Sequence, residues 1–296
     1  MLLQPLMDAM SRQQIPESTL YVIGTPIGNM CDISLRALAI LDAVDVVACE
    51  DTRNTRALLT AYGLNKPLVA AHQHNEREAA QQLITRLQQG ERIAFVSDAG
   101  TPAVSDPGAK IVDSIREAGC HVVPVPGPSA AVTALSASGF PDNRFMFIGF
   151  LPTKSSQRLE ALQPLKTEAA TLVFYEAPHR IKDMLKALGQ VFEPTRRIMI
   201  ARELTKLFEE TWRGTLAEAE DRMAADSNRM KGEFAILVEG AQPAANGVDD
   251  EETKRILSIL IDAMPVSSAA ATAAKILGKK KNQLYSLALE LKDAED

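Results

Sequence analysis

The chain has 296 residues, which at ~150 residues per domain predicts about two domains with room for a small third. Hydrophobic residues make up 46% and charged residues 24%, and the mean hydropathy is −0.06, so collagen-like, disordered and membrane-spanning classes are excluded. The net charge of −6 excludes a protein that coats nucleic acid through its overall charge, so any nucleic-acid binding would need a local basic patch.

The cysteines and the N-terminus bear on the cellular compartment. Cys31, Cys49 and Cys120 form no CxxC pair, which argues against a zinc ribbon or a thioredoxin-like site. Their odd number and the absence of a basic leader favour a reducing cytoplasm. Residues 1–17 are expected to form a loosely ordered tail.

The first half of the chain alternates apolar strands with helices. The strands are continuous apolar runs, which are typical of a parallel sheet covered on both faces. Asp32 or Ser34 would cap the first helix. We expect strands at 19–23, 44–49, 67–71, 92–96 and 122–125, and helices near 35–41, 56–62, 76–89, between 107 and 119, and from 129.

Four loops of this half share the edge where ligands bind in such sheets, at the carboxyl ends of the strands: 24–29, 50–53, 97–108 and 126–129. The loop 97–108 holds two Gly, two Pro and two Asp, and its small residues leave room for a flat ligand such as a nucleoside. Aspartate turns would equally explain it as a plain surface loop. The loop 24–29 matches neither GxGxxG nor a P-loop, and 126–129 also fits a rigid turn with Ser129 as N-cap.

The second half predicts a mixed α/β unit followed by a helical segment. Residues 240–250 resemble a linker, and 251–296 predict three short helices, with Ser267 and Asn282 as N-caps. The expected strands are 145–150, 171–175, 197–202 and 233–238, the expected helices are 155–168, 178–188 and 215–226, and 209–213 begins or ends a hairpin.

Two kinds of polar cluster admit more than one interpretation. His72 and His74 with Glu76 could ligate a metal, but a lone HxH without a further cluster favours a polar loop, and no metal is predicted. The polar residues of 176–180 and 202–206 follow expected strands and form either ion-pair networks or the wall of a polar cleft.

Residues 264–292 carry a local charge of +4, which suits phosphate contact at Lys279–Lys281 or simply solubilises a helical appendage.

Seven sequence blocks in a fixed order carry a family resemblance. They are GTPIGN (24–29), CEDTR (49–53), SDAGTPAVSDPG (97–108), PGPSA (126–130), FYEAPHR (174–180), RELTKLFEE (202–210) and KGEFAILVEG (231–240). With these blocks the chain resembles the small-subunit ribosomal RNA methyltransferases of the tetrapyrrole-methylase superfamily over about residues 19–240, and the tail is also similar.

The resemblance implies two α/β subdomains of the tetrapyrrole-methylase type (a class III methyltransferase) plus a small C-terminal helical domain. The expected parts are a tail at 1–17, an N-terminal α/β subdomain at 18–138, a second α/β subdomain at 139–240, a linker at 241–250 and a helical RNA-binding domain at 251–296.

The resemblance also implies a function. It implies S-adenosylmethionine-dependent 2′-O-methylation of a cytidine ribose in small-subunit ribosomal RNA, within the assembled or nearly assembled subunit, by a cytoplasmic homodimer without a membrane partner. Methylation of a tetrapyrrole precursor or a diphthamide intermediate is an alternative, which the lysine-bearing tail and the polar His, Arg and Glu residues argue against. A non-enzymatic ribosome-binding module is another.

The resemblance assigns site residues as well. The superfamily's Gly-Asp-Pro is replaced here by Gly100-Thr101-Pro102, so that aspartate is not carried over, and whether Asp98 replaces it is left open. Cofactor contacts are implied for Pro26, Asp98, Ala99, Gly100, Ala103, Val104, Ser129, Ala130, Phe174, Tyr175, Ala201, Leu204 and Gly232.

Transfer of a methyl group to a ribose hydroxyl requires positioned reactants and is helped by a base. The candidates for that base are Glu50, Asp51, Glu176 and Glu203. Arg53 and Arg202 would hold a phosphate or orient the ribose, and the RNA-binding candidates are His74, His179, Arg180, Lys279, Lys280 and Lys281.

Overall fold

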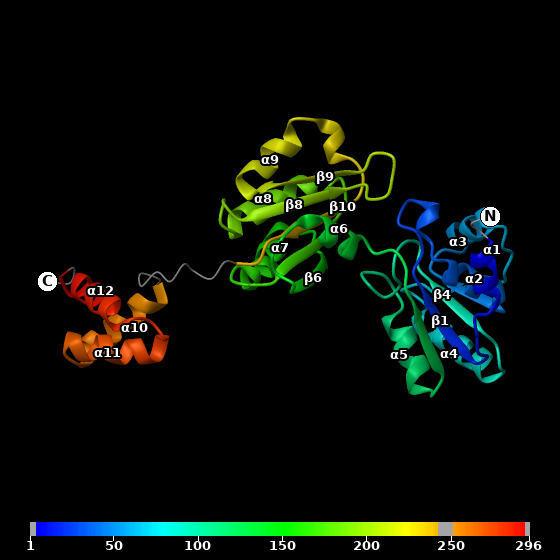
Figure 1. Cartoon of the computed structure of the whole chain (residues 1–296), viewed down its shortest axis with the longest axis horizontal. Helices are drawn as coiled ribbons and strands as arrows, with labels where there is room; N and C mark the ends of the chain where they lie inside the picture. The colour runs from blue at the N-terminus through cyan, green and yellow to red at the C-terminus, as the bar shows by residue number, and fades with distance from the viewer. Residues whose placement is uncertain (1–3, 242–250, 294–296) are drawn as a thin grey trace. The chain divides into compact units, whose positions relative to one another are not determined.

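A computed structural model describes residues 4–241 and 251–293 of the chain (Figure 1). Among these, residues up to Lys166 together with Ala170–Glu239 form one compact unit, and Thr167–Ala169 with residues from Gly240 onward form a second. Within the described ranges, no helix combines the length and apolar character needed to cross a lipid bilayer.

The first half of the large unit is an all-parallel sheet. Its strands are β1 (Thr19–Ile23), β2 (Val46–Cys49), β3 (Leu68–Ala70), β4 (Ile93–Val96) and β5 (His121–Val125), in the order β3-β2-β4-β1-β5. Helices α2 (Leu35–Ala43) and α3 (Thr52–Ala61) pack on one face, and α4 (Glu76–Gln88) and α5 (Ala109–Glu117) on the other. Successive residues of β1 therefore point to opposite faces of the sheet: Leu20 packs in the core with α4 and α5, and Tyr21 packs in the core with α2 and α3.

The helix boundaries follow the caps. Ser34, and not Asp32, caps α2, because its side chain accepts a hydrogen bond from the Ala37 amide at 3.1 Å. Helix α3 begins at Thr52, four residues before the prediction, because the Asp51 carboxylate accepts the Arg53 amide at 2.8 Å. The segment expected to be a tail contains helix α1 (Gln4–Ser11).

The second half of the large unit is a mixed sheet. Its strands are β6 (Phe145–Phe150), β7 (Thr171–Glu176), β8 (Arg197–Arg202), β9 (Glu210–Thr215) and β10 (Phe234–Val238), in the order β6-β7-β10-β8-β9. Only β6 and β7 pair in parallel, so the expected mixed pairing and the hairpin at 209–213 are confirmed. Helices α7 (Ser155–Leu162), α8 (Ile181–Val191) and α9 (Leu216–Ala224) share one core with this sheet. Helix α7 is shorter than predicted because Pro164 falls in the 3₁₀ turn η2 (Gln163–Leu165) that follows it.

Helix α6 (Ala130–Ser138) connects the two halves. It follows β5 of the first sheet, and its Ala131 and Ala134 pack against Val173 and Ala235 of the second. Ser129 occupies the N-cap position as expected, but its side chain makes no capping bond. The Ala131 amide instead donates to the Tyr175 hydroxyl at 3.0 Å, so the start of α6 is bonded to β7.

The C-terminal unit contains the three expected helices, α10 (Glu251–Ala263), α11 (Val266–Leu277) and α12 (Lys281–Asp293). Leu257, Ala270 and Leu284 lie in its core, one from each helix. Both predicted caps are wrong: α11 begins at Val266 after Pro265, ahead of Ser267, and α12 already includes Asn282. Most of the expected linker, residues 242–250, lies outside the described residues.

Helix α8 offers a simple stability test at Gly189. This glycine is exposed in the helix, and the nearest atom to an added Cβ would be Glu220 Oε1 at 3.8 Å. Gly189→Ala should therefore raise the free energy of unfolding by ~0.5–1 kcal/mol, since alanine loses less backbone freedom on folding. Urea denaturation measures the change, and a lower midpoint would contradict it.

Candidate active site

A cavity of about 310 Å³ is lined by loops from both sheets of the large unit. Of the lining residues, Ile27 follows β1, residues 99–101 and 104–106 follow β4, and Ser129 and Ala130 follow β5. Because β4, β1 and β5 are adjacent parallel strands, their carboxyl ends share one edge of the sheet. From the second sheet, Tyr175 and Glu176 end β7, Ala201 and Leu204 lie at the end of β8, and Phe234 begins β10.

The first-half wall is preorganised by contacts between its loops. The Thr25 amide donates to the Gly100 carbonyl at 2.9 Å, and the Gly100 amide donates back at 3.0 Å. The Thr101 hydroxyl donates to the Pro128 carbonyl at 3.2 Å. Gly24 and Gly127 lie back to back, so closely that a Cβ on Gly127 would be 2.7 Å from Cα of Gly24. The glycines of these loops are therefore required for close packing of backbone on backbone.

Unusual backbone conformations are concentrated at this cavity. Ala103 (φ 65°) and Ser105 (φ 61°) lie in the loop after β4, and Glu203 (φ 50°) and Thr205 (φ 68°) lie in the loop after β8. Of the non-glycine residues with positive φ in the described ranges, only Ser18 lies elsewhere. Such conformations cost about 1–3 kcal/mol each and tend to occur at functional sites, where the surrounding structure holds them in place.

Two carboxyl groups with perturbed acidity line the cavity. Burial raises the pKa of Glu176, whose side chain is fully buried. Its Oε1 accepts the Ala177 amide at 2.9 Å and lies 3.2 Å from Arg180 Nε, whereas Oε2 is buried without a hydrogen-bond partner. Burial also raises the pKa of Asp106, against a lowering bond from Ser97. Both groups bind a proton more readily than an exposed carboxylate, as general bases near neutral pH require.

A second, polar cavity of about 450 Å³ lies at the ends of β2 and β3 and contains Glu50, His74 and Asp98. Asp98 accepts the Asp51 amide at 3.2 Å and Asn54 Nδ2 at 2.8 Å, so it fixes the start of α3 and does not face the first cavity. Burial raises the pKa of Glu50, and the charges of Asp98 and then Asp106 raise it further. The described residues contain no group of three or more His, Cys, Asp or Glu placed to hold a metal ion.

The structure brings most of the expected cofactor residues together and leaves five out. Pro26 is buried, and Ala103 neighbours the lining residue Val104 without lining the cavity itself. Phe174 is fully buried in the core on the far face of the sheet, because successive residues of β7 point to opposite sides. Gly232 lies against Glu203 of the loop after β8, and Asp98 accepts the Asp51 amide at the start of α3. The expected residues that line the cavity are Ala99, Gly100, Val104, Ser129, Ala130, Tyr175, Ala201 and Leu204.

The expected catalytic residues do not form one cluster. Of them, Glu176 alone lines the first cavity, while Glu50 and Asp51 line the second. Glu203 accepts a bond from Lys206 Nζ at 2.8 Å; burial alone would raise its pKa, but the bonds from Lys206 and from the Glu233 amide lower it. Arg53 is 88% exposed and pairs with Asp51 at 2.7 Å, and Arg202 lies near Glu210.

The expected RNA-binding residues are also spread out. His74 and His179 are exposed, whereas Arg180 binds Glu176 and the Leu151 carbonyl. In the C-terminal unit Lys280 and Lys281 are exposed, and Lys279 donates to the Thr253 hydroxyl.

Several lining residues were missed by sequence reasoning. Thr101, Ser105 and Asp106 lie inside loop 97–108, and Lys206 lies inside the sequence block 202–210, so the signal for these four residues is present in the sequence. Phe150 could have been found as the last residue of an expected strand. The other missed residues are Ile27, Ala177, Pro178, Glu233, Phe234 and Ala235.

Comparisons with known proteins identify the family of the chain. Residues 19–220 match the family model described as Tetrapyrrole (Corrin/Porphyrin) Methylases, and residues 247–292 match the RsmI C-terminal HTH domain. The chain is 47% identical over 274 residues to the Ribosomal RNA small subunit methyltransferase I of Escherichia coli O157:H7, covering 93% of this chain and 96% of that protein. The protein of the same name from Xylella fastidiosa is 50% identical over 269 residues, covering 90% and 97%.

A solved structure supports the fold. The uroporphyrin-III-C-methyltransferase from Thermus thermophilus matches with a TM-score of 0.54 and 21% identity, covering 75% of this chain and 94% of that one. At this identity the match concerns the arrangement of the two α/β halves and not the substrate.

Proposed function

Because the chain belongs to the tetrapyrrole methylase family and, within it, groups with the ribosomal RNA small subunit methyltransferases I, we propose that it methylates the 2′-hydroxyl of a cytidine in small-subunit ribosomal RNA with S-adenosylmethionine as donor. The observation that carries the proposal is the 310 Å³ cavity, whose wall is largely apolar and includes Glu176, a residue with one buried carboxylate oxygen that has no hydrogen-bond partner. Cavities of this size suit a nucleoside-sized ligand.

The cavity fits the proposed donor. Its small side chains, Ala99, Gly100, Ser129, Ala130 and Ala201, leave room for a flat nucleoside. Asp106 and Glu176 supply acceptors for hydroxyl groups and negative charge beside a cationic sulfonium. S-Adenosylmethionine supplies an already activated methyl group, so the protein's own work is to hold the ribose in line with it and to remove the hydroxyl proton.

Glu176 is the residue we assign to proton removal. The unpartnered Oε2 can accept the proton of the 2′-hydroxyl, while Oε1 stays bonded to the Ala177 amide beside Arg180. Burial raises the pKa of this carboxyl, which makes it a stronger base than an exposed glutamate. The remaining expected candidates either lie in the second cavity or are paired with basic side chains.

Labelled methyl donor, mixed with purified small subunits from cells that lack the protein, tests the proposal. Label in the ribosomal RNA at a ribose oxygen is the expected result. Label in a macrocyclic precursor alone would favour tetrapyrrole methylation, and donor binding without transfer to either substrate would favour a binding module. A comparison of label transfer to free ribosomal RNA and to intact small subunits then shows whether the assembled particle is the substrate.

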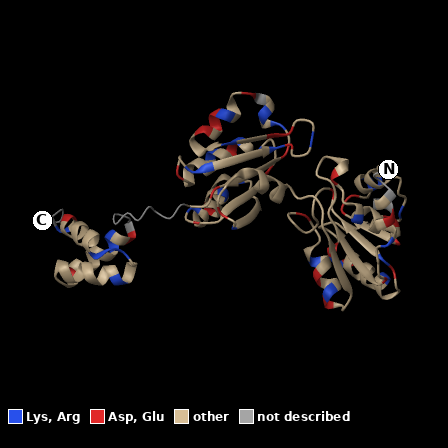
Figure 2. Ribbon diagram, in the orientation of Figure 1, with Lys and Arg blue, Asp and Glu red and all other residues tan. Residues whose placement is uncertain are grey.

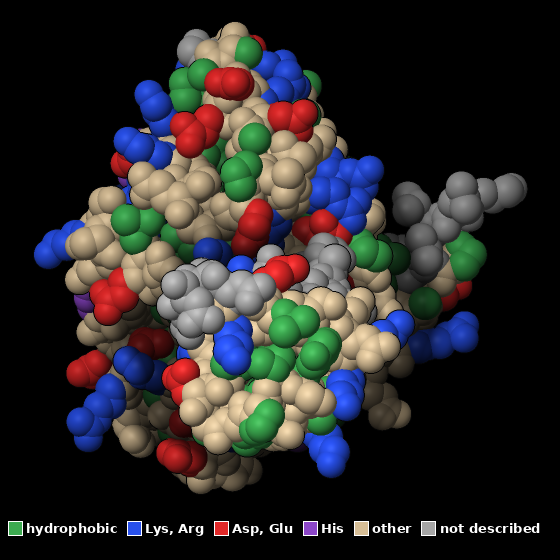
Figure 3. Space-filling model, turned by 90° about the vertical axis from the view of Figure 1, so that its left-hand side faces the viewer, with side chains coloured by type: hydrophobic (Ala, Val, Ile, Leu, Met, Phe, Trp, Pro, Cys, Tyr) green, Lys and Arg blue, Asp and Glu red, His purple; other side chains and the backbone are tan. Residues whose placement is uncertain are grey.

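The C-terminal unit is assigned to RNA contact. Lys280 and Lys281 are exposed, and Ile259, Ile276 and Tyr285 are apolar residues on its surface. Figure 3 shows hydrophobic side chains on the surface, with lysines and arginines among them. Phosphates attract the lysines, and the apolar side chains can contact unstacked bases.

Deleting residues 251–296 should raise KM for the small subunit by roughly tenfold or more, because several phosphate contacts are lost. The affinity for the methyl donor, measured by calorimetry, should stay within about twofold of the full chain, since the cavity is lined by residues of the large unit. An equal loss of both would indicate that these helices support the fold instead.

The homodimer and the compartment belong to the same proposal. Phe145, Met146 and Phe150 of edge strand β6 and Val132 of α6 are exposed apolar side chains, 37–57% accessible, and support a contact between two copies of the chain. Sedimentation of the full chain tests this. A ribosomal substrate would place the reaction in the cytoplasm.

A further inference from the structure

The loop between β8 and β9, residues 203–209, carries two adjacent apolar side chains at its tip. Leu207 is 90% exposed and Phe208 66% exposed, the two highest values among the large hydrophobic residues that the structure describes. Single exposed apolar residues are common, but a neighbouring pair with an aromatic ring on one loop is not explained by packing within the chain. In Figure 1 this loop joins the ends of β8 and β9.

The loop has a defined shape. The Thr205 amide donates to Glu209 Oε2 at 2.5 Å, and the Glu209 amide donates to the Lys206 carbonyl at 3.1 Å. Glu203 and Thr205 have positive φ values, and Lys206 is bonded to Glu203 and, at 2.9 Å, to Glu233. These bonds fix the turn from which Leu207 and Phe208 project, so the two side chains are held outward by the structure around them.

The same loop also forms part of the cavity wall. Leu204 and Lys206 line the cavity. Lys206 additionally packs on the first half, since a Cβ on Gly28 would lie 2.4 Å from its Cγ. The exposed tip therefore begins one residue after a side chain that faces the proposed methyl-transfer site.

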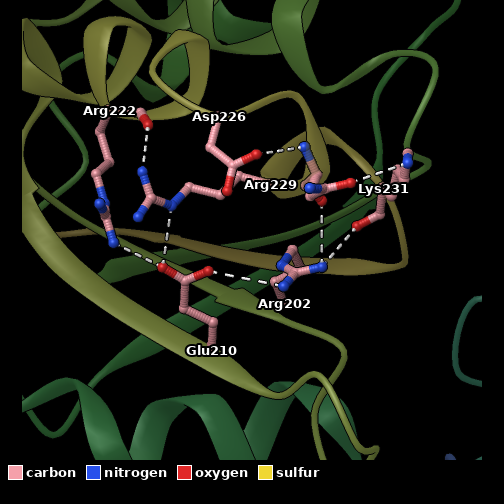
Figure 4. A network of polar contacts seen from close by, with 7 residues as sticks. Arg202, Glu210, Arg222, Asp226, Arg229 and Lys231 are labelled. Carbon is pink, nitrogen blue, oxygen red and sulfur yellow. Dashed lines mark hydrogen bonds and ion pairs between the residues drawn. The ribbon is translucent and has the colours of Figure 1, made fainter.

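A group of basic side chains lies at the base of the loop, where β8 ends and β9 begins (Figure 4). Glu210 lies 2.6 Å from Arg222, 3.4 Å from Arg229 and 3.7 Å from Arg202. One carboxylate thus lies within ion-pair distance of three guanidinium groups. The buried Nε atoms of Arg202 and Arg222 have no hydrogen-bond partner. Arg222 and Arg229 remain 31% and 25% exposed, so the excess positive charge is accessible to an anion. In Figure 2 the ribbon is coloured blue at basic residues on α9 and on the neighbouring strands.

The apolar tip of the loop, the arginine group where the loop joins β8 and β9, and the cavity beside the loop together match the chemistry of single-stranded RNA. Proteins hold unpaired nucleotides by stacking bases on aromatic rings and by neutralising the backbone with arginines. A second copy of the chain would need a broader apolar surface than Leu207 and Phe208, which are flanked by Lys206 and Glu209. The charge and the aromatic ring together favour RNA over a protein partner.

We propose that loop 203–209 is an RNA clamp, in which Phe208 stacks on an unpaired base next to the modified nucleotide while Arg222 and Arg229 bind a nearby phosphate. This inference rests on the proposed RNA substrate and adds the residues that select an unstacked strand. Figure 4 shows Arg222 and Arg229 at the same oxygen of Glu210, Oε1, whereas Arg202 lies at the other oxygen, Oε2.

Phe208→Ala in the full chain tests the stacking. With labelled donor and small subunits as substrate, KM should rise by roughly tenfold, more than kcat falls, because stacking on one base is lost. Phe208→Trp should restore most of the affinity, since it keeps an aromatic face. Leu35→Ala, a truncation of another apolar side chain, 40% exposed and at the start of α2, is the matched control and should leave KM unchanged.

Arg229→Gln tests the phosphate contact. The slope of log KM against log salt should become shallower by about one unit. Arg144→Gln removes the same charge from an exposed arginine beside Asp142 and should leave the slope unchanged.

The outcomes separate the clamp from the proposed function. An unchanged KM in Phe208→Ala would overturn the clamp, as would a parallel loss of donor affinity by calorimetry, and a shift in the sedimentation coefficient would instead assign Phe208 to a contact between protein copies. Wild-type protein that transfers no label to RNA would overturn the proposed function itself. In that case, quenching of a 2-aminopurine-labelled single-stranded RNA by wild-type chain, but not by Phe208→Ala, would still support the clamp.

Discussion

Glu176→Gln is expected to lower kcat by roughly a hundredfold or more while the methyl donor still binds, because the variant loses the proton acceptor and keeps the shape of the side chain. The amide can still accept the Ala177 N–H bond that Oε1 accepts now. Labelled transfer to small subunits measures kcat, and calorimetry measures donor affinity. Glu176→Asp retains a carboxylate and should keep more of the rate than Glu176→Gln.

The pH profile gives an independent readout of this residue. A base must be ionised to act, so the rate should fall as the pH drops through the pKa of Glu176, which burial raises above its ordinary value of 4.5. Glu176→Gln should lack that acidic limb and show a flat, low rate. A variant that keeps the wild-type rate, or one that loses donor affinity in the same proportion, would show that Glu176 only supports the structure.

Gly127→Ala should weaken donor binding by more than tenfold and lower the free energy of unfolding by about 1–3 kcal/mol, the usual cost of overpacking. The added Cβ would lie 2.7 Å from both Cα and O of Gly24, and neither backbone atom can move without shifting the loop after β1. That shift would displace Ile27 from Ser129 and Ala130 across the cavity. Calorimetry and urea denaturation measure the two effects.

Gly119→Ala is the matched control for this prediction. Gly119 has φ 76° just after α5, with no atom within 4 Å of an added Cβ, so alanine there adds left-handed strain without a clash. The free energy of unfolding of the Gly119→Ala variant should be about 1–2 kcal/mol lower, while donor affinity stays unchanged. If both variants lost affinity equally, the loss at Gly127 would reflect general destabilisation rather than the close approach of two loops.

Much of the fold could be predicted because its signals are local. Apolar runs bounded by glycine and proline locate the strands of the first sheet, and the switch to mixed pairing after Pro141 is visible in the sequence and confirmed by the order of the second sheet. The resemblance to the methylase family and the implied enzyme class are confirmed by the family match and by the similarity to small-subunit ribosomal RNA methyltransferases. Helix starts were less predictable, since Asp51 caps α3 four residues before the expected start and α11 begins after Pro265 rather than at Ser267.

The site was predictable at the level of loops but not of side chains. Motif positions located the loop 97–108, yet they do not reveal that Asp98 turns toward Asn54 while Asp106 faces the cavity. Strand periodicity separates Phe174 from Tyr175 only when the buried face is known. The pairing of Arg202 with Glu210 and of Glu203 with Lys206 depends on the β8–β9 hairpin, which brings together residues whose spacing carries no such information.

The bond between Tyr175 and the start of α6 has a chemical consequence. Burial raises the pKa of the Tyr175 phenol above its ordinary value of 10, so the ring oxygen keeps its hydrogen at neutral and mildly alkaline pH. That oxygen already accepts the Ala131 amide, and this interaction does not consume the phenolic hydrogen. The Tyr175 phenol thereby adds an uncharged hydroxyl group to those of Ser105 and Ser129 in the cavity wall, where a ligand that presents a lone pair can bind it at neutral and mildly alkaline pH.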